Sequence, residues 1–253
     1  MNPTYYRTEL LRIFRDIPGL FFTAVLPAFL YVIFGASQSY SDASAGNGNV
    51  AAWVMINMSL YGAVTATTGI GGSSAVERMQ GWGRQLGLTP MNDGAYVAAK
   101  AAVGVTIAAI PVGLIYLLGL ITGAEADGQV WVLSAVLVLV GASMFSVFGL
   151  SFGLAFKSEG AVSAASGSLV ILAFLGNLFF PLSGTMLTVA SFTPLYGIAA
   201  LARYPLTEGW IVNADAIEPV QQALWIPLAN VGVWALILGL VATLLVRLSR
   251  GRQ

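Results

Sequence analysis

Residues 160–202 read GAVSAASGSLVILAFLGNLFFPLSGTMLTVASFTPLYGIAALA and contain no charged side chain. As a single α-helix this stretch would be roughly 64 Å long, whereas the hydrocarbon core of a bilayer is about 30 Å thick. Pro181 and Pro194 interrupt it, and each proline removes a backbone donor and breaks or kinks a helix. The stretch therefore contains either one membrane crossing followed by a shorter feature, or two crossings.

The composition of the whole chain is that of a membrane protein. Of its 253 residues, 57% are hydrophobic and only 9% are charged, whereas a soluble domain carries about 25% charged residues. The mean hydropathy is +0.82. Five more uncharged stretches reach the length of about 20 residues that a helix needs to cross a bilayer. The sequence therefore predicts an all-α, polytopic membrane protein that forms a single transmembrane domain over residues 1–253.

The positions of Lys and Arg decide how often residues 160–202 cross. Cytoplasmic loops collect these residues, and one crossing places ten of the eleven on the same side, with Arg203 alone on the other. Two crossings would move Arg247, Arg250 and Arg252 outside. We therefore predict a multi-pass protein of the cell membrane with both termini in the cytoplasm. The six predicted crossings are 17–36, 50–72, 101–124, 130–156, 160–180 and 223–246, with an interfacial helix at 4–16 and an outer re-entrant hairpin at 185–202.

The N-terminal segment 4–16 has the pattern of an amphipathic helix lying in the membrane interface. Tyr6, Leu10 and Ile13 recur at helical spacing, and Arg7, Arg12 and Arg15 supply a basic side. A topology anchor and a partner contact are both compatible with this pattern.

The loop 74–89 between the second and third crossings begins with the sequence of a capping box. Ser74 and Glu77 have the spacing at which the two side chains satisfy free amides at a helix start. We expect a short helix that exposes Glu77, Arg78 and Arg84 and ends before Thr89-Pro90. Such a helix is either a solvated connector or a lever that passes movement from a cytosolic partner to the membrane.

The second predicted crossing carries a polar stripe. In a membrane helix such residues face protein or water, and hydrogen bonds between helices are their usual role. We therefore favour a role for the stripe in a helix interface. A role in lining a substrate path is the alternative. Gly149 and Gly153 form a GxxxG pair, which permits close approach of a second helix. The stripe consists of residues at i, i+4, i+8 and i+11: Asn57, Tyr61, Thr65 and Thr68.

Several functional classes lack the residues they need. The chain has no Cys and no His, and no charged residue falls inside the six predicted crossings, so we assign neither catalytic residues nor a metal site. The same absence argues against a proton-driven transporter. The best match to a phosphate-binding loop, Phe156-Lys157-Ser158, lacks the required glycine. Net charge is zero, which gives no argument for nucleic acid.

Three features, in this order, resemble the permease subunits of type-2 ABC transporters. The first is the interfacial helix before the first crossing. The second is Glu77-Arg78-Met79-Gln80-Gly81 followed by Leu86-Gly87-Leu88-Thr89-Pro90, which is similar to the family's coupling segment. The third is the run from Asn177 to Gly184 followed by Phe192-Thr193-Pro194, which resembles the end of its fifth helix and its outer hairpin. Trp82-Gly83-Arg84 departs from the family, many members of which have a small or hydroxyl residue after the first glycine.

The resemblance implies a bacterial exporter of the inner membrane. Two ATP-binding cassette subunits would bring ATP and magnesium, and a second permease would complete a homodimer or heterodimer. The cargo would be an amphipathic or hydrophobic small molecule or lipid, as in multidrug efflux. The alternatives are a secondary transporter or channel not driven by ATP, a membrane enzyme that acts on lipids, and a membrane scaffold. The residues implied in coupling are Glu77, Arg78, Gly81, Arg84, Thr89 and Pro90, and those of the outer hairpin are Phe180, Pro181 and Pro194.

Overall fold

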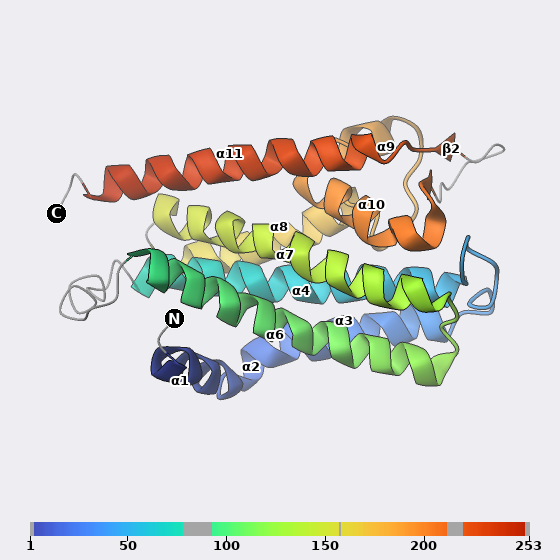
Figure 1. The fold of residues 1–253 in the computed structure, drawn as a ribbon, viewed down its shortest axis with the longest axis horizontal. Helices are drawn as coiled ribbons and strands as arrows, with labels where there is room; N and C mark the ends of the chain where they lie inside the picture. Colours follow the sequence, from blue (N-terminus) through green and yellow to red (C-terminus); the bar gives the residue numbers. More distant parts are fainter. Residues whose placement is uncertain (1–2, 78–92, 157, 212–219, 251–253) are drawn as a thin grey trace.

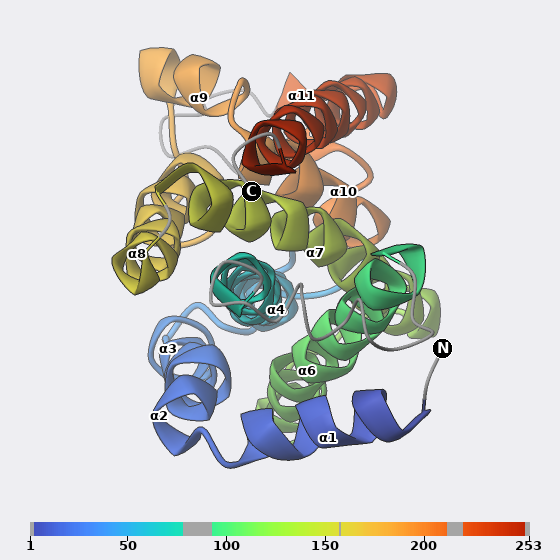
Figure 2. The same ribbon diagram turned by 90° about the vertical axis from the view of Figure 1, so that its left-hand side faces the viewer.

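Helix α4 (Val50–Glu77) runs through the centre of the molecule, with the other long helices packed around it (Figure 1, Figure 2). The computed structural model describes residues 3–77, 93–156, 158–211 and 220–250. Within these ranges the strands are β1 (Trp210–Ile211) and β2 (Val220–Gln221), which pair antiparallel. Almost all other regular structure is helical, so the prediction of an all-α polytopic fold is confirmed.

Five helical segments in the described part of the chain are long and apolar enough to cross a membrane. A helix makes its backbone hydrogen bonds within the segment, as a lipid environment requires. The first segment, Ile17–Ala36, joins α2 (Ile17–Leu20), η1 (Phe21–Val25), α3 (Leu26–Tyr31) and η2 (Val32–Ala36), of which η1 and η2 are π-helical. The others are α4, Ala102–Thr122 of α6 (Asp93–Thr122), α7 (Gly128–Phe156) and Trp225–Val246 of α11 (Trp225–Arg250).

Helix α1 (Pro3–Phe14) lies across one end of the bundle, which is the orientation expected of an interfacial helix (Figure 2). The C-terminal end of α11 lies at this same end, which we call the α1 end (Figure 1). The opposite end carries α9 (Gly184–Ala190), α10 (Pro194–Thr207) and the two strands, and we call it the hairpin end.

Helix α8 (Glu159–Leu175) ends five residues before the predicted crossing 160–180 does. Its 17 residues span about 26 Å. Gly176 caps the helix, and Asn177 has a φ of +60°, a left-handed conformation that a right-handed helix cannot continue. The side-chain oxygen of Asn177 then accepts a hydrogen bond from the backbone N of Leu182 at 2.7 Å. The chain therefore leaves the helix at Asn177 and not at Pro181.

Helices α9 and α10 form a bent pair at the hairpin end, where the outer hairpin 185–202 is predicted. Their axes meet at 95°. Pro194 is the first residue of α10, a position where the missing proline N–H would have no helical partner in any case. A bend of this kind keeps the irregular backbone at the end of the bundle and packed against protein.

Glycine brings α4 and α7 into backbone contact. A Cβ atom added to Gly71 would lie 1.9 Å from the carbonyl oxygen of Ser146, and one added to Gly149 would lie 2.0 Å from that of Thr68. At Gly153 it would lie 2.6 Å from the Cβ of Ala75. The prediction that Gly149 and Gly153 permit close helix approach is confirmed, and α4 is the partner helix.

The predicted helix start at Ser74 is wrong. Helix α4 continues without a break from Val50 to Glu77, five residues beyond the predicted end of the second crossing at Gly72. The hydroxyl of Ser74 donates to the carbonyl oxygen of Ile70 at 2.7 Å, which is a bond within the helix and not a cap. The expectation that Glu77 is exposed is also wrong, because its side chain is buried by partners from α1 and α6.

Candidate functional site

Four charged side chains from three helices meet at the α1 end. Glu9 and Arg12 lie one turn apart on α1, Glu77 is the last residue of α4, and Lys100 lies about two turns into α6. Lys100 Nζ donates to Glu77 Oε2 at 2.7 Å and to Glu9 Oε2 at 2.8 Å. Arg12 Nη1 donates to Glu77 Oε1 and lies 3.8 Å from Glu9 Oε1. We call these four residues the charge cluster.

The charge cluster is balanced, with two acids and two bases, and most of it is shielded from water. The side chain of Lys100 is 7% exposed and each carboxylate 12%, whereas that of Arg12 is 59% exposed. Removing a partner from a buried pair leaves an uncompensated charge and costs about 3–5 kcal/mol. The cluster therefore holds α1, α4 and α6 in one fixed arrangement at this end of the bundle.

A cavity of about 260 Å³ lies beside the charge cluster, between α1, α2, η1, α4, α6 and α8. All four members of the cluster line it, and α4 adds Thr65 and Ser73. Leu20, Ile107 and Val162 supply apolar surface. Apolar walls with a few grouped polar side chains are typical of sites for small organic ligands. The arrangement is suited to a small amphipathic molecule with its polar part toward the α1 end.

The four residues of the predicted polar stripe lie in different environments. Asn57 is fully buried and accepts a hydrogen bond from Arg203, and the ring of Tyr61 packs edge-on against Phe179 with centroids 5.2 Å apart. Thr68 donates to the carbonyl oxygen of Phe145 in α7 at 3.4 Å. Thr65 bonds within its own helix, to the carbonyl oxygen of Tyr61, and lines the cavity. Asn57, Tyr61 and Thr68 thus make contacts with other segments, and Thr65 borders the open space.

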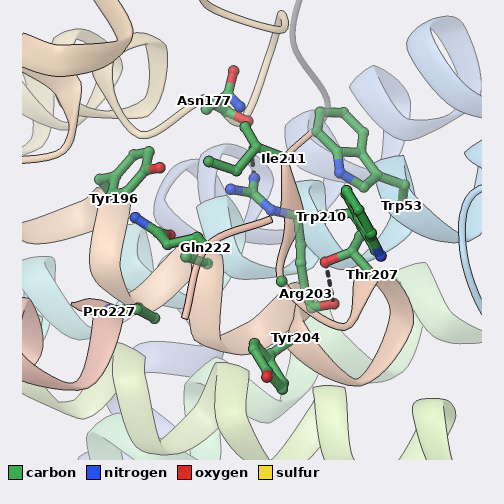
Figure 3. Close-up of a pocket in the computed structure, with 12 residues that line it drawn as sticks. Trp53, Asn177, Tyr196, Arg203, Tyr204, Thr207, Trp210, Ile211, Gln222 and Pro227 are labelled. Carbon is green, nitrogen blue, oxygen red and sulfur yellow. Dashed lines mark hydrogen bonds between the residues drawn. The ribbon is translucent and has the colours of Figure 1, made fainter. Parts of the chain in front are cut away.

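A second site lies at the hairpin end, around Arg203 of α10 (Figure 3). The Nη1 atom of Arg203 donates to Asn57 Oδ1 at 2.8 Å and to the carbonyl oxygen of Asn177 at 2.9 Å. The guanidinium carbon lies 5.4 Å from the centre of the Trp53 ring, within range of a cation–π contact. Arg203 therefore joins α10 to α4, about two turns from the start of that helix, and to the turn that follows α8.

The predicted coupling residues lie at the edge of the described chain. Glu77 is in the charge cluster, whereas Arg78, Gly81, Arg84, Thr89 and Pro90 fall outside the described residues. Of the predicted hairpin residues, the ring of Phe180 packs against Phe34 and Phe174 and is half exposed. Pro181 is partly buried in the turn before α9, and Pro194 is buried at the start of α10.

Sequence reasoning missed the roles of Glu9, Lys100 and Arg203. The pairing of Glu9 with Lys100 joins residues 91 apart, which no local pattern reveals. Arg203 carried a usable signal, because it directly follows 43 uncharged residues, at 160–202, and charged residues embedded in apolar segments are usually functional. Arg203 lies four residues after Ala199 and three residues before Leu206, and both of these are buried. Residues at these spacings share one face of a helix, so Arg203 lies on the inner face of α10.

Comparison with known proteins gives one informative match. No protein-family model matches the chain. The chain is 25% identical over 194 residues to the Bacillus subtilis (strain 168) protein named "Putative transport permease YvfS", a region that covers 74% of this chain and 78% of that protein. The match extends over most of both chains. The chain is thus a multi-pass membrane protein related to a transport permease.

Proposed function

We propose that the chain is the membrane-spanning permease subunit of an ATP-driven ABC exporter. The α1 end faces the cytoplasm, and both termini lie there. Two ATP-binding cassette subunits bind at this end and bring ATP and magnesium, and a second permease completes a dimer. The similarity to YvfS supports a transport permease role, and the absence of a phosphate-binding loop from the sequence is consistent with energy supplied by a separate chain.

The observation that carries the proposal is the position of Glu77. It ends the central helix α4 and is held at once by Arg12 of α1 and Lys100 of α6. The segment 78–92, which contains the predicted coupling residues Arg78, Gly81, Arg84, Thr89 and Pro90, follows directly. A displacement of this segment by an ATPase would be passed to α4 through the chain, and to α1 and α6 through the ion pairs. Movement would thus reach three helices together.

The cargo is proposed to be an amphipathic or hydrophobic molecule. The cavity beside the charge cluster would receive it from the cytoplasmic side, with its polar part near Lys100 and its apolar part against Leu20 and Val162. Because Glu77 and Lys100 line this cavity and also tie the helices together, movement of the helices would change the shape of the cavity. Energy coupling and cargo binding would then share the same residues.

The test is transport by the reconstituted complex. The chain is purified with the ATP-binding cassette protein that accompanies it and placed in proteoliposomes. Uptake of a set of fluorescent amphipathic dyes and hydrolysis of ATP are then measured together. We expect dye movement to require ATP, and Glu77→Gln or Arg78→Glu to lower the number of dye molecules moved per ATP while the ATPase stays bound. Arg7→Gln, an exposed cation on the same helix as Arg12, is the matched control and should behave as the unmodified protein.

Two results would contradict the proposal. Dye flux that continues without ATP and follows an ion gradient would identify a secondary transporter or a channel. If Glu77→Gln and Arg78→Glu both transport dye at the unmodified rate with the ATPase bound, the segment after α4 has no role in coupling and only connects two helices.

A further inference from the structure

Arg203 brings a positive charge into a buried site without a carboxylate partner among the described residues. Its side chain is 6% exposed. The ion pairs of the described chain join Arg12, Lys100, Glu9 and Glu77 at the other end of the bundle. The groups that Arg203 contacts are an amide oxygen, a backbone carbonyl and the Trp53 ring, and all three are neutral. A buried cation is normally paired, because an isolated buried charge is costly.

A buried donor beside Arg203 lacks an acceptor among the described residues. A guanidinium has five N–H donors, and both side-chain hydrogen bonds of Arg203 leave from Nη1. The Nδ2 atom of Asn57, whose Oδ1 accepts from Arg203, is buried and has no acceptor in the described part of the chain. A negatively charged group with acceptor atoms would balance the charge of Arg203 and accept a hydrogen bond from Nδ2 of Asn57.

A small cavity of about 20 Å³ lies at the guanidinium (Figure 3). Besides Arg203 its lining includes Tyr196, Tyr204, Trp210 and Gln222. A cavity of this size holds about one water-sized group, which is also the size of one oxygen of an oxyanion. It does not hold a whole organic molecule, so any larger ligand would insert only an acidic oxygen and leave its remainder outside.

The aromatic lining indicates where such a ligand would come from. Trp and Tyr gather at the level of the lipid headgroups in membrane proteins, and the exposed Trp210 lines this cavity beside Tyr204 and the buried Trp53 and Tyr196. Headgroups at this depth present phosphate oxygens, which Arg recognises well because its planar fork matches them. We propose that Arg203 binds a phosphate group of an anionic amphiphile, a phospholipid-type headgroup, at the hairpin end of the bundle.

The purified chain in detergent micelles provides a test that needs no transport. Tryptophan fluorescence reports the site, since Trp53 and Trp210 line it. The probes are dihexanoyl phosphatidylglycerol, inorganic phosphate at constant ionic strength, and dihexanoylglycerol as an uncharged amphiphile of the same chain length. We expect a saturable change with the phosphatidylglycerol and none with dihexanoylglycerol. A response to inorganic phosphate of equal affinity would assign the same phosphate chemistry to a free ion instead of a headgroup.

Two substitutions identify the residue responsible. Arg203→Gln keeps hydrogen-bond donors and removes the charge, and it should weaken phosphatidylglycerol binding about tenfold or more. Asn57→Asp has nearly the same shape and gives Arg203 a permanent carboxylate 2.8 Å from Nη1. It should abolish binding and raise the melting temperature, which a loss of fold would not do. Arg7→Gln, an exposed cation at the α1 end, should bind as the unmodified chain does.

Three outcomes would overturn the proposal. One is an unmodified chain that shows no saturable response to either phosphate probe. Another is equal binding by Arg203→Gln and the unmodified chain. The last is a response that appears only after Asp215→Asn or Glu218→Gln, because the chain would then supply its own counter-ion to Arg203.

Discussion

Glu77 Oε2 and Lys100 Nζ lie 2.7 Å apart at the point where α4 ends, and both side chains are buried. Lys100 contacts Glu9 as well, and Arg12 contacts the other oxygen of Glu77. Since each charge has a partner, the group is stable as a whole and sensitive to the loss of any member. This relationship gives the α1 end a defined structure in a region that hydropathy alone describes only as the end of two membrane helices.

The first prediction concerns the coupling between these two residues. Lys100→Met removes one of the two cations of the charge cluster and should lower the free energy of unfolding by about 3–5 kcal/mol. Glu77→Gln should be similarly destabilising. The double variant should lose less free energy of unfolding than the two single variants lose in sum. The difference, which is the interaction energy of the two side chains, should be about 0.5–3 kcal/mol. Thermal or chemical unfolding of the purified chain in detergent measures all four proteins.

Arg7→Gln is the control for this cycle, because Arg7 is exposed and lies on α1 outside the charge cluster. It should change the free energy of unfolding by no more than about 0.5 kcal/mol. Strict additivity of Glu77→Gln and Lys100→Met would show that the two side chains do not interact in the folded protein.

The second prediction tests the contact between α4 and α7. Gly149→Ala adds a Cβ that would lie 2.0 Å from the carbonyl oxygen of Thr68, so the helices must separate, at a cost of about 1–3 kcal/mol. Gly167→Ala in α8 is the matched change, because nothing lies within 4 Å of its added Cβ. That variant should be neutral or slightly stabilising, since Ala favours a helix more than Gly. Melting temperatures that fall equally for both variants would argue against close packing at Gly149.

The sequence was sufficient to predict the bundle, but the helix ends were placed only to within a few residues. Hydropathy marks where charged residues begin, and not where backbone hydrogen bonding stops. Helix α4 continues past Gly72 to Glu77, whose charge is paired with Lys100 and Arg12, residues distant in sequence. Helix α8 stops before the apolar sequence does, because Asn177 adopts a left-handed conformation.

The candidate sites were harder to predict, for a different physical reason. Spacing along one helix places Asn57 and Thr68 on the same side of α4, but it could not show that Asn57 meets Arg203 from 146 residues away. The capping-box pattern at Ser74 was misleading because Ser also bonds the carbonyl four residues back inside a helix. Tertiary contacts decided both cases.

The third prediction separates the cavity from the helix interface. Thr65 lines the cavity and makes its hydrogen bond within α4, so Thr65→Leu should change which dyes are transported, with a stability change below about 1 kcal/mol. Thr68 is fully buried and donates to the Phe145 carbonyl oxygen. Thr68→Val should therefore lower stability by about 0.6–1.7 kcal/mol and leave the dye selection unchanged. Dye transport in proteoliposomes and unfolding in detergent provide the two measurements. If Thr65→Leu lowers stability and Thr68→Val changes the dye selection, Thr65 belongs to the helix interface and Thr68 to the cavity.

The last prediction fixes the orientation of the bundle, on which the proposed function depends. Helix α1 and the C-terminal end of α11 lie at one end of the molecule, and the paired strands β1 and β2 lie at the other (Figure 1). Ten of the eleven basic residues are assigned to the α1 end by the predicted topology, and basic residues are retained in the cytoplasm. A reporter fused after Gln253 that works only in the cytoplasm should therefore be active, and one inserted near Asp215 that works only outside the membrane should be active as well. Exchanging the two reporters should silence both, which controls for expression. If a reporter at Gln253 is active only outside the cell, the orientation or the number of crossings differs from the prediction. The charge cluster would then not lie on the side where an ATPase could bind.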